Sequence, residues 1–398
     1  DVAPSRGLGD VYKRQMYRDC KRYLVLLMAV LFVMMSSLAC EAKGQNLQVG
    51  FVDDIVSADS ENHLLTPQAK QEIRQALKER LRALQSAGKL PFELKSSDVQ
   101  LNNLQQTYDT GIPVVLIPIV TMDDYFPVKY YADGKIFYKA TVLSGLSLAV
   151  CTSSDDMDCR LLAVVPLNRY GIMGGDIRRP IMQPISKADA SQEYIALTKQ
   201  GIAENMDFRS VKRVLKDWQL NQAIPACGVT EVTMTSKKAK AIFQDDPHHI
   251  RNAIADFYTM AYQQASGEPV ILPMTSVKFV EDVHRSMYEG VLRGDSGTLN
   301  LAMAKPAHPI VLDVSGAASK VLQRSDPSDV REDIAYKVWL SAKTGSDAPV
   351  QDSDYATEMR IKNPDGSLQN NYDEVDTCSK LLINLAGKMG KQAGKQKH

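Results

Sequence analysis

The chain contains few of the short motifs that mark enzymes. Its 398 residues include no phosphate-binding glycine-rich loop, no spaced pair of cysteine doublets and no nucleophile elbow. These absences weigh against nucleotide-binding enzymes, zinc-ribbon proteins and α/β-hydrolases. We therefore expect a protein that is not an enzyme and that holds no cofactor and no metal.

The chain also lacks an excess of either charge. It has 47 basic and 47 acidic residues, and removing the six basic and three acidic residues of 1–39 leaves 41 and 44, a net charge near −3. No overall field favours nucleic acid as a partner. With 44% hydrophobic residues and this length, the chain is typical of a globular protein with two domains.

Long apolar runs are missing as well. The run from Leu24 to Met35 has twelve apolar residues, whereas a transmembrane helix needs roughly 20. Basic residues near Met16 precede it and Ser36–Cys40 follows it, which is the order of a cleaved secretory signal. Residues 1–15, upstream of Met16, resemble a translated sequencing adaptor and are excluded from the fold as an artefact.

The end of this signal, Ser37-Leu38-Ala39-Cys40, resembles the lipobox of bacterial lipoproteins, although Leu is more usual at its first position. The resemblance implies that residues 16–39 are removed and that Cys40 is diacylated, with residues 40–46 as a tether. Two acyl chains hold a protein stably on a membrane, so we expect an anchored location in the bacterial cell envelope, at the outer membrane or in the periplasm. The alternatives are cleavage after Ala42, giving a soluble secreted protein, or an uncleaved anchor with an inert Cys40.

Four further cysteines lie in the exported part, where oxidation is possible. Cys151 and Cys159 flank an acidic loop between two apolar runs, so a disulfide could close this hairpin if the strand register places both sulfurs on one face. The spacing of Cys227 and Cys378 indicates no partner for either.

The mature chain reads as two sheet-plus-helix α/β (α+β) domains, 47–186 and 227–390, joined by a helical connector at 187–226. In the first domain Thr66-Pro67 has the chemistry of a helix start, and an apolar stripe continues to Gln85. The last element should be a helix from Asp373 to Met389, and residues 391–398 should be a disordered basic tail. The expected strands lie at 47–52, 92–94, 114–120, 136–150, 161–167 and 229–234.

Local similarity between the two domains suggests an internal duplication. Ile73–Leu77 matches Ile250–Ile254, and Gln85–Gly88 matches Gln264–Gly267, at offsets of 177 and 179 residues. A looser match joins Val142–Gly145 to 311–316. Helix-plus-strand units also resemble one another by chance, so duplication stays a hypothesis here.

The order of export signal, strand, helix with a Gly-containing turn, short strand and hairpin strands is similar to the envelope domains of the curli-secretion lipoprotein family. Lipoprotein activators of peptidoglycan synthases and the N-terminal domain of the Tol-Pal beta-propeller protein have the same pattern. The segments that carry this resemblance are Leu47–Val52, Pro67–Leu94, Leu146–Val150 and Leu161–Val165. It implies binding or assembly without catalysis, and it transfers no functional residue.

Several residue groups could still carry chemistry. Gly294-Asp295-Ser296-Gly297 resembles the nucleophile loop of trypsin-like proteases, but Thr298 replaces a usual Gly and no partner His is evident. Asp245, Asp246, His248 and His249 could bind a divalent metal, or simply begin a helix. The remaining acidic groups, which could bind Ca²⁺ or act as paired acids and bases but also suit polar turns, are Asp155–Asp158, Asp53-Asp54 and Asp123-Asp124.

We therefore expect a membrane-anchored lipoprotein that acts through contacts with envelope proteins or the peptidoglycan machinery in envelope assembly, secretion or cell-wall maintenance. A homo-oligomer is left open. One alternative is an exported hydrolase or metal-dependent enzyme that uses Ser296 or the histidine pair. Another is a solute- or glycan-binding lipoprotein, because two α/β units can enclose a ligand.

Overall fold

The described structure covers most of the chain beyond the export signal. A computed structural model describes residues 47–57, 64–99, 111–132, 135–152, 158–174, 179–220, 224–244, 247–273, 300–302, 306–324, 331–361 and 372–396. The residues from Gln48 onward belong to one compact unit. The signal sequence and Cys40 lie outside the described residues, and the predicted domain boundaries stay predictions.

The first sheet has nine strands and follows the order β10-β7-β6-β4-β1-β3, with β2 beside β4 and with β5 and β8 beside β6. Strand β1 is parallel to β3 and β4, whereas β4, β6 and β7 are antiparallel. The strands are β1 (Gln48–Val52), β2 (Val56–Ser57), β3 (Glu93–Val99), β4 (Val114–Met122), β5 (Tyr125–Ala132), β6 (Lys135–Thr152), β7 (Asp158–Pro166), β8 (Arg169–Met173) and β10 (Asn300–Ala302).

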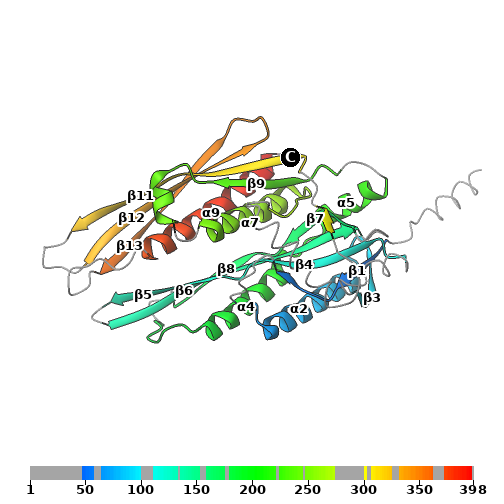
Figure 1. Ribbon diagram of the computed structural model, residues 1–398, viewed down its shortest axis with the longest axis horizontal. Helices are drawn as coiled ribbons and strands as arrows, with labels where there is room; N and C mark the ends of the chain where they lie inside the picture. The colour runs from blue at the N-terminus through cyan, green and yellow to red at the C-terminus, as the bar shows by residue number, and fades with distance from the viewer. Residues whose placement is uncertain are drawn as a thin grey trace, which may run out of the picture. The chain divides into compact units, whose positions relative to one another are not determined.

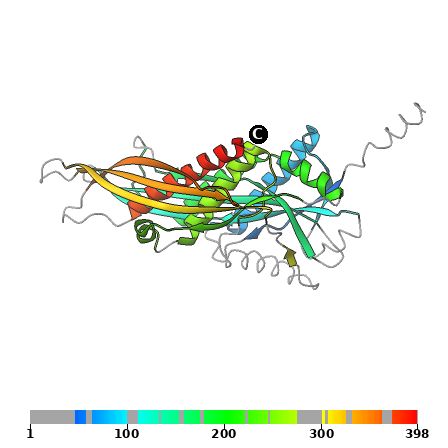
Figure 2. The same ribbon diagram turned by 90° about the horizontal axis from the view of Figure 1, so that it is seen from above.

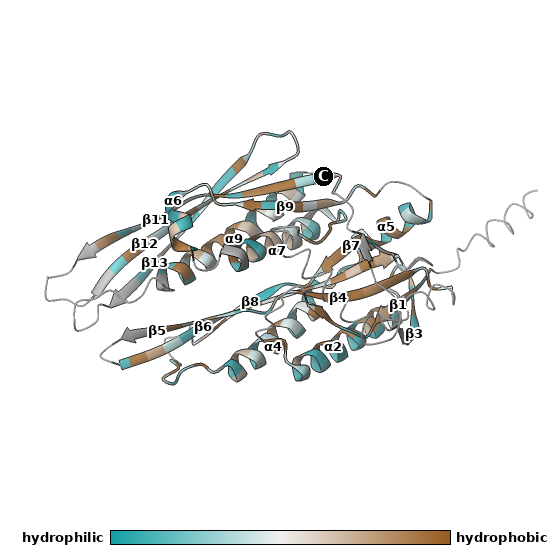
Figure 3. Ribbon diagram, viewed as in Figure 1, coloured by the Kyte–Doolittle hydropathy of each residue, from teal (hydrophilic) through white to brown (hydrophobic). Residues whose placement is uncertain are grey.

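Helices α2 (Pro67–Ser86) and α4 (Lys187–Asn205) pack on each other and on one face of this sheet, and α5 (Arg209–Gln219) packs on β7 (Figure 1). Thr66 caps α2 as predicted, and the helix buries one apolar stripe while its outer face stays polar (Figure 3). A capping box at Ser186 begins α4. Much of the predicted connector therefore belongs to the first layer of helices.

The second sheet has the order β13-β12-β11-β9. Strand β9 is parallel to β11, and the other neighbours are antiparallel. Helices α7 and α9 pack side by side, and they contact strands of both sheets (Figures 1 and 2). The elements are β9 (Cys227–Thr233), α6 (Lys237–Ile242), α7 (Pro247–Ser266), β11 (His308–Arg324), β12 (Arg331–Thr344), β13 (Val350–Ile361) and α9 (Tyr372–Gln396).

The same topology therefore occurs twice. The run β7-β6-β4-β1 matches β13-β12-β11-β9 in order and direction, with α2 corresponding to α7 and α4 to α9. Helices α2 and α7 are followed by Gly88 and Gly267, at φ 64° and 63°. The predicted α/β class with two similar sheet-plus-helix units is confirmed.

Two details of the sequence reading are wrong. Residues 311–316 lie in β11, the counterpart of β4, so their match to Val142–Gly145 in β6 is not a repeat equivalence. The tail predicted to be disordered is helical as far as Gln396. Gly390 and Gly394, near the end of this helix, lie against the backbone of α7: a Cβ at Gly390 would approach the carbonyl oxygen of Tyr258 to 2.3 Å.

Among the described residues, no helix combines the length and the apolar composition needed to span a membrane.

Candidate ligand-binding groove

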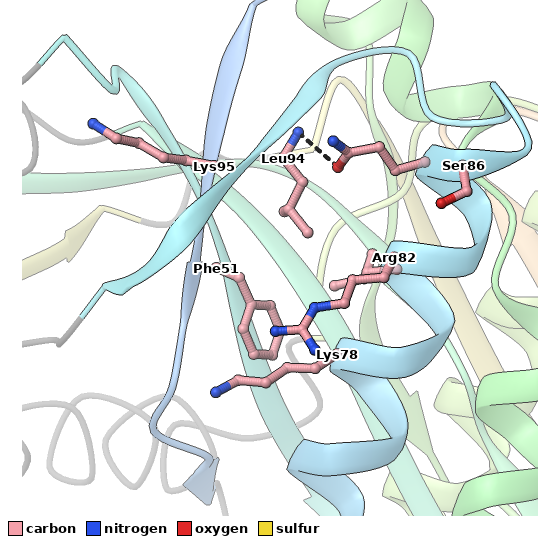
Figure 4. Close-up of a pocket in the computed structure, with 8 residues that line it drawn as sticks. Phe51, Lys78, Arg82, Ser86, Leu94 and Lys95 are labelled. Carbon is pink, nitrogen blue, oxygen red and sulfur yellow. Dashed lines mark hydrogen bonds between the residues drawn. The ribbon is translucent and has the colours of Figure 1, made fainter.

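A groove of about 370 Å³ lies where the C-terminal half of α2 meets strands β1 and β3 (Figure 4). Phe51 and Leu81 form its apolar floor and are almost fully buried. This floor exists because the apolar stripe of α2 packs on the sheet, which leaves the next face of the helix at the rim. The other lining residues are Lys78, Arg82, Gln85, Ser86, Leu94 and Lys95.

The helix side of the groove is cationic. Arg74, Lys78 and Arg82 follow one another at four-residue spacing, so they lie along the same helix face. Asp53, just after β1, pairs with Lys78 at 2.6 Å and with Arg74 at 2.8 Å. Burial acts to raise the pKa of Asp53, but the hydrogen bonds from Lys78 and Arg74 outweigh it and lower that pKa below its ordinary value.

Arg82 and Lys95 differ from these two cations. Within the described residues, no carboxylate forms an ion pair with either of them. In Figure 4, Arg82 extends over the groove beside Phe51, whereas Lys95 projects away from the helix. The groove therefore contains Lys78, whose charge Asp53 balances, and two cations at its rim, Arg82 and Lys95, that form no ion pair with the described carboxylates.

The rim is held by a side-chain bond between helix and strand. The backbone N–H of Leu94 donates to Oε1 of Gln85 at 3.2 Å (Figure 4). Such a bond fixes β3 next to the end of α2. The result is an open, preformed groove that can accept an apolar side chain next to an anionic group.

Sequence reasoning did not identify this groove. The four-residue spacing of Arg74, Lys78 and Arg82 is visible in the sequence, and Phe51 lies in the run 47–52 that was predicted to be a strand. Lys95 and Leu94 come next to them only through the parallel pairing of β1 with β3. The sequence signal that could have indicated the groove is the row of basic residues beside the buried apolar stripe of α2.

The predicted pairs of carboxylates do not act as pairs. Oδ2 of Asp123 accepts hydrogen bonds from the backbone N–H groups of Leu64 and Leu65 at 3.1 and 2.9 Å. Asp124 instead contacts Nδ1 of His249 at 2.5 Å. Asp53 binds the cations of α2, while Asp54 is exposed. Asp53, Asp123 and Asp124 thus each join different segments of the fold.

His249 is the only one of the four predicted metal ligands with a described side chain, and it lies in the first turn of α7. Its contact with Asp124 connects α7 to the end of β4. The described residues include no group of three or more His, Cys, Asp or Glu side chains placed to hold a metal. Asp245, Asp246, the His248 side chain and the Asp155–Met157 loop lie outside the described residues, as does Ser296.

A second buried contact between α7 and β4 was not predicted. Oγ1 of Thr121 donates to Oδ2 of Asp256 at 2.5 Å, and Asn168 donates to the Asp256 carbonyl oxygen. Burial raises the pKa of Asp256 to about 7, although the bond from Thr121 opposes this shift. Since Asp256 is 3% exposed, it links the helix to the sheet and is not open to a ligand.

The proposed disulfide stays a prediction. Cys151 is buried and lies opposite Leu161 in the β6–β7 ladder, two residues along the strand from Cys159. The Cys159 side chain lies outside the described part of the chain. Cys227 is also buried, and its sulfur lies 3.3 Å from the hydroxyl of Tyr262.

Comparisons with known proteins do not place the chain in a family. No family model matches the chain, and no curated protein matches it. Among solved structures, it is similar to rare lipoprotein B from Shewanella oneidensis, at 8% identity and a TM-score of 0.17, over 42% of this chain and 89% of that one. A TM-score this low does not establish a shared fold, so it indicates neither a family nor a function.

Proposed function

We propose that this chain is a lipid-anchored protein of the bacterial cell envelope that binds an acidic partner segment in the groove of α2, β1 and β3 and catalyses no reaction. The export signal and the Ser37–Cys40 sequence support the anchor. The scarcity of catalytic motifs in the sequence supports a binding role.

The observation that carries the binding role is the position of Arg82 beside a buried apolar floor. An exposed arginine at the rim, with Phe51 and Leu81 below it, suits a segment that alternates acidic and apolar side chains. Arginine binds carboxylates through two parallel hydrogen bonds, which gives geometric selectivity. An open groove also suits an extended protein segment better than a small solute, which is normally enclosed.

Peptide binding tests the groove. A fluorescent peptide of alternating Glu and Leu should bind, and a Lys-Leu peptide of equal length should not. Reversing one rim charge with Arg82→Glu or Lys95→Glu should weaken binding about tenfold, since like charges then face each other. Lys212→Glu, on the exposed face of α5, is the matched control. Equal affinity for both peptides would exclude this function.

The anchor has a separate test. Protein expressed from Met16 in a bacterial host should lose residues 16–39, gain acyl mass and partition with membranes. A Cys40→Ala variant should do none of these. A soluble, unacylated wild type would refute the anchor without affecting the peptide experiment.

A further inference from the structure

Strand β3 forms one end of the first sheet and borders the groove. Among the described strands it pairs with β1 alone, and no strand follows it in the sheet order. An edge strand turns part of its backbone N–H and C=O groups away from the sheet. These groups can pair with an extended segment of another chain, which then becomes a further strand of the sheet.

Hydrogen bonds show the direction of the backbone groups at both ends of β3. The N–H of Leu94 donates to Oε1 of Gln85, so it is directed to α2 and the groove and not to β1 (Figure 4). The C=O of Val99 accepts from the N–H of Asp53, just after β1, so it is directed into the sheet. The edge of β3 that begins at Leu94 therefore borders the groove.

The middle of β3 contains more residues than β1 can pair. Val49 pairs with Leu94 and Phe51 pairs with Asp98, so residues 95–97 lie opposite the single residue Gly50. A regular parallel ladder has one residue at this position, and β1 cannot supply partners for the N–H and C=O groups of all three. Backbone groups without a partner in the sheet bond to water, to side chains or to another segment. This part of β3 can therefore bind the backbone of an added segment.

We propose that the acidic segment bound in the groove adds to β3 as a further strand of the first sheet. This inference rests on the proposed function and specifies how the partner is held. On binding, the N–H of Leu94 exchanges Oε1 of Gln85 for a backbone carbonyl oxygen of the segment. Gln85 is exposed on the last turn of α2, so its side chain can turn aside.

Strand addition also accounts for the two kinds of residue that line the groove. Side chains alternate along an added strand, so every second one can face the buried Phe51 and Leu81. The other set can reach Arg82 and Lys95 at the rim, neither of which forms an ion pair with a described carboxylate. Backbone bonds then supply affinity, and the alternating side chains supply selectivity. The occupant is an extended segment of alternating apolar and acidic residues.

Backbone methylation of the peptide tests strand addition. Fluorescence anisotropy compares the Glu-Leu peptide with two isomers, one N-methylated at every Glu and the other at every Leu. The N–H groups of successive strand residues point to opposite edges, so only one isomer loses the donors that face β3. That isomer should bind at least about tenfold more weakly than the other, because it loses several hydrogen bonds. A slip by one residue cannot restore them, since it would place Glu side chains on the apolar floor.

Substitutions in β3 and α2 give a second measurement. Leu94→Pro removes an N–H that does not bond to β1, and Leu94→Ala is its control because it removes only the side chain. The proline variant should bind the unmodified peptide about three- to tenfold more weakly than the alanine variant. Gln85→Ala removes the competing acceptor, so its affinity should equal the wild-type value or exceed it by up to about tenfold.

The outcomes separate this inference from the proposed function. If the unmodified peptide does not bind, the proposed function fails and strand addition fails with it. If it binds and the two methylated isomers have equal affinities, the groove binds an acidic segment, but not as a strand. Tenfold weaker binding by Gln85→Ala would also overturn the inference, because the side chain of Gln85 and not the edge of β3 would then hold the segment. The methylated peptides decide the question even if Leu94→Pro does not fold.

Discussion

The two sheets share a topology but bury their strands differently. The first sheet lies between α2 and α4 on one face and α7 and α9 on the other, and all nine residues of β4 are buried. The second sheet packs on α7 and α9 with one face only, so β12 alternates between buried and more exposed positions. Sheets covered on both faces tolerate near-continuous apolar runs, whereas half-covered antiparallel sheets alternate. The two sheets therefore share a strand order, whereas the number of covered faces determines how apolar each strand is.

The corresponding helices differ in the same way. Helix α2 buries one stripe and exposes the remainder, while α7 is buried continuously from Ala253 to Thr259 because sheets lie on both sides of it. This is why α7 carries buried polar groups such as Asp256 that α2 does not need. The two corresponding helices therefore differ in burial and polarity because α7 packs against a second sheet and α2 does not.

Adjacent substitutions should show the largest difference between the sheets. In β4, Leu116→Ala and Ile117→Ala should each lower the free energy of unfolding by about 2–5 kcal/mol, since the two side chains fill different cores. In β12, Leu340→Ala should cost a similar amount, whereas Ser341→Ala should stay within about 0.5 kcal/mol. Urea denaturation measures all four. If either β4 substitution left the free energy of unfolding unchanged, the face of β4 on which that residue lies would not be covered.

A pH series should show the effect of covering α7 on both sides. Burial raises the pKa of Asp256 from 3.8 to about 7. As pH rises, this carboxyl therefore loses its proton at a lower pH in the unfolded chain than in the folded protein. The stability should therefore fall as pH rises from about 4 to about 7, by about 4 kcal/mol for a shift of some three pKa units. Asp256→Asn should remove this dependence in calorimetric or urea measurements.

The control for this series is Asp352, on β13. A hydrogen bond from Lys388 lowers the pKa of Asp352, so its contribution should be lost as pH falls through the acidic range. Asp352→Asn should leave the decline between pH 4 and 7 intact. An unchanged pH profile in the Asp256→Asn variant would mean that this carboxyl is ionised in the folded protein.

Two glycines of α9 should respond in opposite directions. A Cβ at Gly390 would lie 2.3 Å from the carbonyl oxygen of Tyr258, so Gly390→Ala should force the paired helices apart at a cost of about 1–3 kcal/mol. A Cβ at Gly387 meets nothing within 4 Å, so Gly387→Ala should stabilise the helix by about 0.5–1 kcal/mol. Thermal unfolding of both variants would test whether α7 and α9 are in close contact. Similar shifts in both would argue against that contact.

These glycines also show where sequence reasoning stopped. The periodicity of α2 and the N-cap at Thr66 are local signals, and they predicted the helix correctly. Residues 391–398, with Gly394 and three lysines, were predicted to be a disordered tail because the sequence does not reveal that α7 lies beside Gly394. The groove was missed for the same reason, since Phe51 and Lys95 meet only through strand pairing. Local sequence patterns were enough to predict helices, strands and the fold class. Contacts between segments that are distant in the sequence became visible only in the structure.

The outer face of the second sheet gives the smallest expected effect. Nζ of Lys337 lies 4.9 Å from the ring centroid of Trp339, on the face of β12 that points away from α7 and α9. At an exposed site such a cation–π contact contributes about 0.5–1 kcal/mol, so Lys337→Gln should lower the free energy of unfolding by no more than that. Lys343→Gln, on the same face, should have no measurable effect. A loss above about 2 kcal/mol for Lys337→Gln would exceed what an exposed contact supplies, and this face would then have to be covered like those of the first sheet.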